Sequence, residues 1–212
     1  FFMKTNCPMQ PSRRRAVKTV ASLLALSTVS GFLLGCSPDK PQFKSIDLTG
    51  ADYAQGFSLI DHNGQLRTLK DFAGTVVVVF FGFTQCPDVC PTSMAELAQV
   101  KQQLGADGDK LQGIFITVDP ERDTAEMLKA YMGNFDPTFL ALRPTLEQLP
   151  QVAKDFKIYY KKVDGKTPGS YTMDHSAGSY VFDEKGRIRL YNRYGSGADG
   201  LASDIRLLIK SS

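Results

Sequence analysis

Residues 75–81 read Thr-Val-Val-Val-Val-Phe-Phe, a run of β-branched and aromatic side chains with no alternating polar positions. Such a run is typical of a central strand that is covered on both faces. It ends at Gly82, and residues 111–118 repeat the pattern. A shorter apolar run at residues 139–142 predicts a third strand. Because buried strands of this kind occur in α/β proteins, these runs set the expected fold class.

Helical segments and hairpins surround these strands. Apolar positions recur at helical spacing in four stretches: residues 92–104, 124–132, 146–156 and 201–209. Two pairs of short apolar runs are typical of antiparallel hairpins: residues 57–60 with 65–69, and residues 179–183 with 187–191. The alternation of strand and helix predicts an α/β domain with a mixed sheet flanked by helices and with added β-hairpins.

The first 35 residues have the features of a bacterial lipoprotein signal peptide. A basic cluster at residues 13–18 precedes an apolar run at residues 20–34, which ends in a lipobox-like Leu-Leu-Gly-Cys. We therefore expect Cys36 to be acylated and the protein to be anchored in a bacterial cell membrane, with its domain facing the periplasm. An uncleaved spanning anchor and an incidental cysteine are the alternatives. The polar residues 36–52 are expected to form a tether, so that the folded domain covers residues 53–212.

The excess positive charge is confined to the head of the chain. Of 25 Lys and Arg, five lie before Cys36, whereas none of the 22 Asp and Glu does. The rest of the chain therefore has 20 basic and 22 acidic residues, a net charge near −2. Because no basic surface is left to neutralise phosphates, this balance excludes nucleic acid as the expected partner.

Two cysteines remain for chemistry once the head is set aside. If Cys7 is removed with the signal peptide and Cys36 is acylated, Cys86 and Cys90 are the free thiols. They lie between the apolar strand and the helix that follows it, at a strand's carboxyl end, where open α/β sheets place their sites. Pro91 is expected to be the first helical residue and Cys90 its cap, so that the helix terminus lowers the pKa of Cys90.

The spacing of the two thiols favours a metal over a structural disulfide. Residues four apart on a helical turn have Cβ atoms about 5–6 Å apart, whereas a disulfide needs Cβ atoms about 3.5–4.5 Å apart. A metal with bonds of about 2.3 Å to each sulfur bridges the wider gap easily. Pro87 and Pro91 both disturb a regular helix, so reversible oxidation of the pair stays open.

Two thiolates leave a soft metal short of ligands, and imidazole is the natural third donor for copper. The chain has two histidines. His62 lies in a hairpin turn and is expected to be a solvated loop residue. His175 lies in a loop at residues 171–176, just before a predicted strand, and Asp174 beside it could orient its ring. Taken alone, a loop histidine is more often an ordinary surface residue than a metal ligand.

Four motifs follow one another along the chain: Gly-Phe-Thr-Gln-Cys-Pro-Asp-Val-Cys-Pro at residues 82–91, Thr-Val-Asp-Pro-Glu-Arg-Asp-Thr at 117–124, Tyr-Tyr-Lys-Lys-Val at 159–163 and Asp-His-Ser at 174–176. In these motifs and in their order, the chain resembles the Sco/SenC family of copper proteins that assist cytochrome c oxidase assembly. This resemblance implies that Cys86 and Cys90 are copper thiolates and His175 the copper imidazole. Asp119 matches a family acid near the site, although a turn role before Pro120 is equally consistent.

The same resemblance implies a thioredoxin-like fold for residues 53–212 that binds copper as Cu(I) and as Cu(II). It also implies a metallochaperone rather than an enzyme, one that passes copper or electrons to the CuA-bearing subunit of the oxidase. Other periplasmic copper chaperones are then expected partners, together with the membrane through the lipid anchor. Gln85 and Met173 depart from common family residues, which leaves the three-ligand site intact.

Three other functions stay open. A thiol-disulfide reductase acting on cysteines of a partner protein needs Cys86 and Cys90 but not His175. A thiol peroxidase is weakened by the adjacent second cysteine and by the lack of a clear activating arginine near the loop. A redox sensor or plain structural lipoprotein would leave the cysteine arrangement without purpose.

Overall fold

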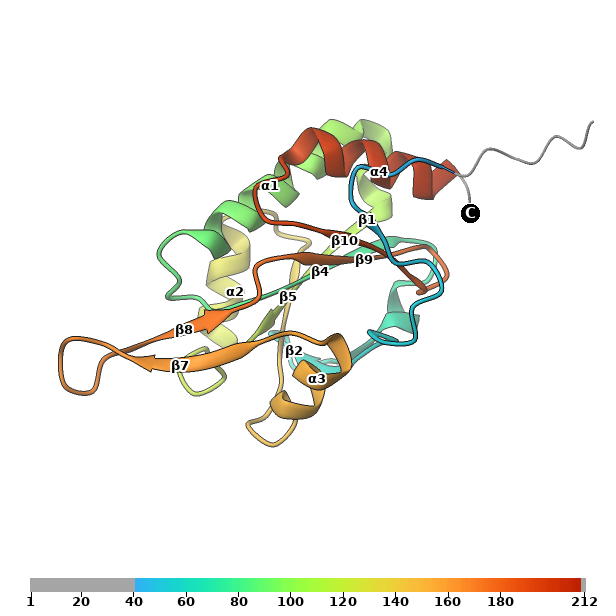
Figure 1. The fold of residues 1–212 in the computed structure, drawn as a ribbon. Coiled ribbons are helices and arrows are strands. Elements are labelled where there is room, and N and C mark those ends of the chain that lie inside the picture. Colours follow the sequence, from blue (N-terminus) through green and yellow to red (C-terminus); the bar gives the residue numbers. More distant parts are fainter. Residues whose placement is uncertain (1–40, 211–212) are drawn as a thin grey trace, which may run out of the picture. The chain divides into compact units, whose positions relative to one another are not determined.

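An eight-stranded mixed sheet forms the centre of the structure, a computed structural model that describes residues 41–210 (Figure 1). Its strands run in the order β1-β10-β9-β4-β5-β6-β2-β3. They are β1 (Ile46–Asp47), β2 (Ser58–Asp61), β3 (Leu66–Thr68), β4 (Val76–Gly82), β5 (Leu111–Thr117), β6 (Leu140–Arg143), β9 (Ser179–Phe182) and β10 (Ile188–Asn192). The chain from Pro41 onward forms one compact unit.

The apolar run at residues 75–81 lies at the centre of this sheet, in β4. All seven residues of β4 are buried, because β4 pairs in parallel with β5 on one side and antiparallel with β9 on the other. β5 continues in parallel to β6, and two antiparallel hairpins, β2–β3 and β9–β10, complete the expected elements. The predicted mixed sheet is confirmed.

Among residues 41–210, four helices flank the sheet, and their apolar faces add to the core. They are α1 (Val89–Leu104), α2 (Ala125–Gly133), α3 (Leu149–Phe156) and α4 (Ala198–Lys210), with short 3₁₀ turns η1 (Leu69–Phe72) and η2 (Gly105–Lys110). α1 and α4 lie side by side (Figure 1). In α4 the buried residues Leu201, Ile205 and Leu208 recur three or four positions apart, which is why this segment packs as a helix. In the described chain, no helix is long and apolar enough to cross a membrane.

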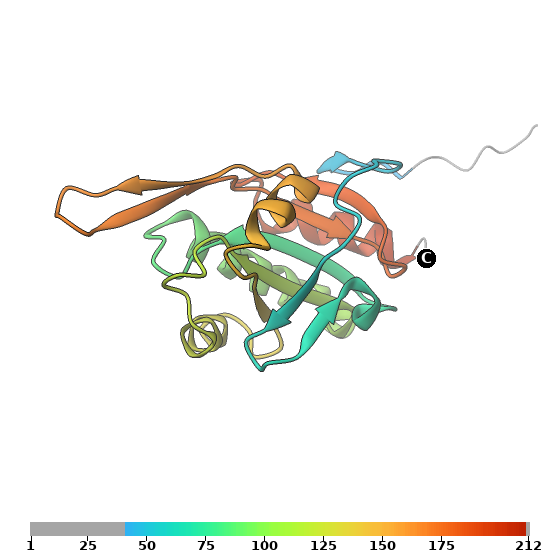
Figure 2. The same ribbon diagram turned by 90° about the horizontal axis from the view of Figure 1, so that it is seen from below.

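A second, two-stranded sheet was not predicted. β7 (Tyr160–Asp164) and β8 (Tyr171–His175) pair antiparallel with each other and extend from the body of the domain (Figure 2). Lys161, Lys162 and Asp174 are exposed in this hairpin, so it has little of the apolar alternation that marks a half-buried strand. His175 is therefore the last residue of a strand rather than part of a loop.

The folded part begins earlier than the predicted boundary at residue 53. β1 pairs with β10, and the backbone N–H groups of Lys44 and Ser45 donate to the buried Asp204 carboxylate at 2.8 Å each. Residues 36–52 were expected to form a tether, and these contacts place the second half of that segment within the domain. Because this segment is polar, its sequence did not indicate the edge strand β1, which gains its pairing partner β10 only in the folded chain. The expected signal peptide and acylated Cys36 lie outside the described residues.

The prediction for His62 also needs correction. Its Nδ1 accepts a hydrogen bond from the backbone N–H of Ala141 at 3.1 Å, and its own backbone N–H donates to the Ala141 carbonyl at 2.9 Å. Burial lowers the pKa of this imidazole. His62 is thus a structural link between the β2–β3 turn and β6 rather than a solvated loop residue.

Candidate metal centre

The structure brings Cys86, Cys90 and His175 together. Their ligand atoms, two Sγ and one imidazole nitrogen, all lie within 4.8 Å of one another. Cys90 Sγ is 3.3 Å from His175 Nε2, and both thiols are free. Cys86 follows β4, Cys90 lies in the first turn of α1 and His175 ends β8. Within the described residues, this is the one cluster of His, Cys, Asp or Glu with metal-binding spacing.

A glycine makes room for the buried thiol. A Cβ atom on Gly82 would lie 2.8 Å from Cys90 Sγ, which is closer than real Cβ contacts allow. After Gly82 the chain turns, with the backbone N–H of Cys86 donating to the Phe83 carbonyl at 3.2 Å. The absent side chain therefore lets the Cys90 thiol approach the end of the central strand.

The imidazole is held in one tautomer. His175 Nδ1 lies 2.9 Å from the Ser176 carbonyl oxygen. Because a carbonyl only accepts, Nδ1 is the nitrogen that donates a proton, and Nε2 keeps its lone pair toward Cys90. The ring also stands nearly perpendicular to those of Phe80 and Phe83, at centroid distances of 6.1 and 5.8 Å. These contacts orient the ring as a metal ligand requires.

The electrostatics of the cysteine pair differ from the prediction. Cys90 is not the helix cap, because α1 begins at Val89 with Asp88 before it. Burial raises the pKa of the Cys90 thiol instead of the helix terminus lowering it. The backbone N–H of Cys90 donates to Cys86 Sγ at 3.4 Å, which holds the Cys86 sulfur beside the first turn of α1.

Burial also lowers the pKa of His175, which favours the neutral ring that binds metals. A buried thiol and a neutral imidazole carry little charge of their own. A cation that enters the cluster would therefore displace the thiol protons and supply the charge that stabilises the thiolates.

The donor set fits a three-coordinate soft metal ion. Bonds of about 2.0–2.3 Å to nitrogen and sulfur place the three ligand atoms of a planar site about 3.5–4.0 Å apart. That spacing lies inside the 4.8 Å limit found here. Two thiolates and one imidazole favour copper or zinc over hard cations such as magnesium.

The two acidic residues predicted to support the site have different surroundings. Asp119 is 2% exposed, and its Oδ1 accepts from the Tyr171 hydroxyl at 2.9 Å while Oδ2 accepts from Arg122 Nε. It therefore acts on β8, the strand that carries His175. Asp174 is exposed and faces Lys161 across the hairpin. Because the Ser176 carbonyl takes the Nδ1 hydrogen bond, the orienting role predicted for Asp174 is wrong.

Sequence reasoning missed a further buried acid. Asp123 is fully buried, and its carboxylate accepts from the Thr84 backbone N–H at 3.1 Å and from the Thr84 hydroxyl at 2.6 Å. It thereby holds the loop that leads from β4 to Cys86. Burial raises the pKa of this carboxyl group. Its signal is the run Asp-Pro-Glu-Arg-Asp after a buried strand, which contains Asp123 as well as Asp119.

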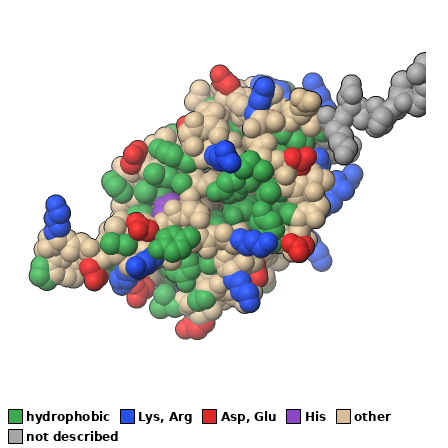
Figure 3. Space-filling model, viewed as in Figure 1, with side chains coloured by type: hydrophobic (Ala, Val, Ile, Leu, Met, Phe, Trp, Pro, Cys, Tyr) green, Lys and Arg blue, Asp and Glu red, His purple; other side chains and the backbone are tan. Residues whose placement is uncertain are grey.

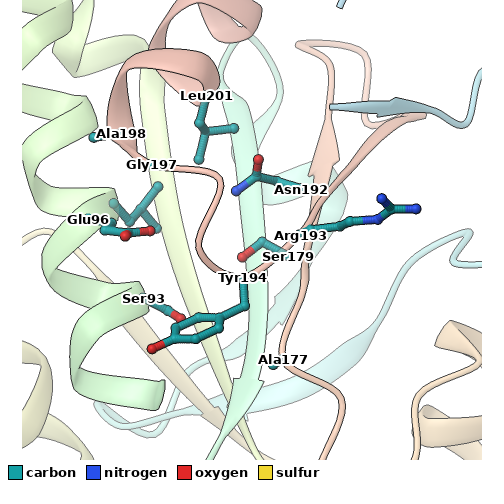
Figure 4. Close-up of a pocket in the computed structure, with 11 residues that line it drawn as sticks. Ser93, Glu96, Ala177, Ser179, Asn192, Arg193, Tyr194, Gly197, Ala198 and Leu201 are labelled. Carbon is teal, nitrogen blue, oxygen red and sulfur yellow. The ribbon is translucent and has the colours of Figure 1, made fainter. Parts of the chain in front are cut away.

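A separate small pocket lies among α1, β9, β10 and the start of α4 (Figure 4). Ser93, Glu96, Tyr194 and Leu201 are among the residues that line it. None of the three candidate ligands does, so this pocket is not part of the metal centre.

Comparison with known proteins gives a consistent result. A family model described as SCO1/SenC matches residues 47–210. The mitochondrial SCO2 homolog of Bos taurus is 36% identical over 170 residues, which cover 79% of this chain but 64% of that protein. The SCO2-like protein RT0576 of Rickettsia typhi is 33% identical over 182 residues, which cover 84% of this chain and 90% of that one.

A solved structure agrees with these sequence matches. The structure of Bradyrhizobium japonicum ScoI with copper bound is 40% identical in sequence, with a TM-score of 0.66. The match covers 72% of this chain and 97% of that one. The predicted thioredoxin-like fold is confirmed by this neighbour. Since the family model covers more than half of the chain, the protein belongs to the SCO1/SenC family.

Proposed function

We propose that the protein binds one copper ion through Cys86, Cys90 and His175 and delivers it during assembly of cytochrome c oxidase. The convergence of two thiols and one neutral imidazole, with Nε2 3.3 Å from a buried sulfur, carries this proposal. Copper in a 40% identical relative supports the choice of metal. The recipient in this proposal is the CuA-bearing subunit of the oxidase, and other periplasmic copper chaperones are expected partners.

The surface beside the cluster suits a protein client. A shallow groove lined by Ile46, Leu48, Tyr53 and Tyr191 reaches Ser176, the residue next to His175. Apolar side chains form several patches on the face shown in Figure 3. Aromatic and aliphatic side chains surrounded by a rim of polar groups are common at protein–protein interfaces. A client seated there would meet the metal through the His175 edge of the site.

Copper titration of the reduced protein tests the proposal. Because Cys7 and Cys36 also offer thiols, the parent for this experiment carries serine at both positions. It should bind one equivalent of copper tightly, and Cys86→Ser or Cys90→Ser should abolish tight binding because each removes a soft ligand. His62→Ala is the matched control and should bind like the parent. Equal copper content in the single-cysteine variants after removal of loose metal contradicts the proposal.

A thiol-disulfide reductase is the second candidate, because Cys86 and Cys90 are free thiols and the Cys90 N–H donates to Cys86 Sγ at 3.4 Å. It needs the two thiols and not the imidazole. His175→Ala separates the two functions, since it should lower copper affinity at least about tenfold while the thiols still oxidise and reduce. If that variant binds copper and supports oxidase assembly like the parent, thiol exchange becomes the better function.

We also propose that Cys36 is acylated and holds the domain on the periplasmic side of a bacterial membrane. The lipobox-like end of the apolar run supports this. Mass spectrometry of membrane-extracted protein should find a lipid-modified cysteine as the first residue. An unmodified Cys36, or an intact head, would favour a spanning anchor or a product without an anchor.

A further inference from the structure

We infer that Arg122 is a positioning residue of the metal site, whose guanidinium group holds the His175-bearing hairpin against the cysteine-bearing loop. This inference rests on the proposed copper function and names a residue outside the three ligands. It is based on the contacts of the Arg122 side chain, which link three separate segments: the loop before Cys86, the loop after β5 and the first residue of β8.

The hydrogen bonds of Arg122 make that bridge. Its Nη1 donates to Gln85 Oε1 at 3.0 Å and to the Tyr171 carbonyl at 2.9 Å, while its Nε donates to Asp119 Oδ2. Gln85 immediately precedes Cys86, and Tyr171 begins the strand that ends at His175. One rigid planar group is thus bonded to both sides of the metal cluster.

Tyr171 strengthens the bridge with its side chain. The Arg122 Cζ atom lies 3.6 Å from the centre of the Tyr171 ring, and the ring's hydroxyl donates to Asp119 Oδ1 at 2.9 Å. Arg122, Tyr171 and Asp119 therefore form a closed set of contacts, which we call the arginine clasp. The Arg122 side chain is 20% exposed and that of Asp119 is 2% exposed, so water screens this pair less than a surface ion pair.

The hairpin depends on such contacts because it is not part of the main sheet. β7 and β8 pair with each other and with no strand of the eight-stranded sheet. At its base, Tyr159 and Ser176 exchange hydrogen bonds of 2.9 and 3.0 Å. The Lys162–Glu121 ion pair is about half exposed on both sides and is expected to contribute little. The clasp is therefore the main polar connection from the hairpin to the cysteine side of the cluster.

The chemistry of the clasp requires arginine rather than any cation. A guanidinium offers several N–H donors in a fixed plane and stacks on an aromatic ring, whereas a lysine ammonium is a point charge. Among the described residues nothing accepts a hydrogen bond from Arg122 Nη2, although this atom is buried. Such a group costs stability when it is left unpaired. This unpaired group is consistent with a requirement for an arginine at position 122, whose other two nitrogens, Nε and Nη1, make the contacts described above.

A double-mutant cycle on copper affinity tests the inference. The variants are Arg122→Lys, His175→Ala and the double variant, in the background with serine at positions 7 and 36, and a chromophoric Cu(I) chelator competes for the metal. Arg122→Lys should lower affinity about tenfold, because the imidazole is then poorly placed. In the His175→Ala background the same change should matter less than about twofold, because its target is gone.

Three further measurements complete the test. In the metal-free protein, Arg122→Lys should speed hydrogen exchange of the β8 amides and leave β4 unaffected. Arg67→Gln is the matched control: it removes a guanidinium 2.8 Å from the buried Asp61 in the β2–β3 hairpin, and it should change neither affinity nor β8 exchange. Tyr171→Leu, which removes the stacked ring, should repeat the coupling to His175 and carries the test if Arg122→Lys does not fold.

Additive losses in the cycle, or an Arg122→Lys variant with parental affinity, would overturn the positioning role. A failure of the proposed function is recognised separately. In that case the parent itself fails to bind copper, or His175→Ala binds it with parental affinity before Arg122 is changed.

Discussion

Replacing Gly82 with alanine tests how closely the buried thiol packs against the central strand. The added Cβ would lie 2.8 Å from both Cys90 Sγ and Phe115 Cε2, and 2.9 Å from Phe80 Cε1. The backbone cannot easily retreat, because Gly82 ends the parallel ladder with β5 and its carbonyl accepts from the Val118 N–H at 2.8 Å. The neighbouring side chains must therefore move.

The size of the effect follows from two opposing terms. Overpacking a well-packed core costs about 1–3 kcal/mol. Alanine also restricts the unfolded chain, which recovers about 0.4–1 kcal/mol. We expect Gly82→Ala to lower the free energy of unfolding by about 1–2 kcal/mol in urea denaturation, with an unchanged m-value. Because Cys90 Sγ is one of the displaced atoms, copper affinity should fall as well.

Two matched variants separate crowding at the thiol from general effects. Gly133→Ala lies in α2 with nothing within 4 Å of the new Cβ, so it should stabilise the protein slightly. Gly113→Ala would place its Cβ 2.7 Å from the Phe139 ring, so it should destabilise the core but leave copper affinity unchanged. Parental stability and copper affinity in Gly82→Ala would refute the packing argument.

Two further predictions concern stability. Asp204→Ala leaves the backbone N–H groups of Lys44 and Ser45 without their acceptor. It should therefore lower the free energy of unfolding by about 1–3 kcal/mol and speed hydrogen exchange of these two amides. Parental protection of both amides would contradict the anchoring role of Asp204. Burial lowers the pKa of His62 and His175 from the usual 6.5, so below that pH the unfolded chain binds protons that the folded metal-free chain does not. Unfolding free energy should therefore fall as the pH drops below 6.5, less steeply in His175→Gln, and equal slopes in urea titrations would contradict this.

Strong local patterns made most of the fold predictable. β4 and β5 are continuous apolar runs whose burial on both faces leaves no other assignment. Helix α4 and the β9–β10 hairpin follow from equally clear spacing. The β7–β8 hairpin has polar, exposed positions, and its strand partners are visible only once the chain is folded. The edge strand β1 was not predicted for the same reason.

The site shows the same division. The cysteine spacing favoured a metal at Cys86 and Cys90, because soft donors are chemically distinctive. His175 was expected as the third ligand only through the resemblance to the Sco/SenC family. The pKa of Cys90 was predicted in the wrong direction, since the start of α1 and the burial of the thiol depend on tertiary packing. Arg122 and Asp123 were missed because their roles lie in contacts with residues 37 to 49 positions away.

The most direct test of the account is X-ray absorption spectroscopy of the Cu(I)-loaded protein, in the background with serine at positions 7 and 36. The parent should show two sulfur scatterers at about 2.3 Å and one imidazole nitrogen at about 2.0 Å, taking zinc bond lengths as a guide. His175→Ala should lose the imidazole scattering and keep both sulfurs. A spectrum that this substitution leaves unchanged, or a parent with fewer than two sulfurs, would contradict the proposed site of Cys86, Cys90 and His175.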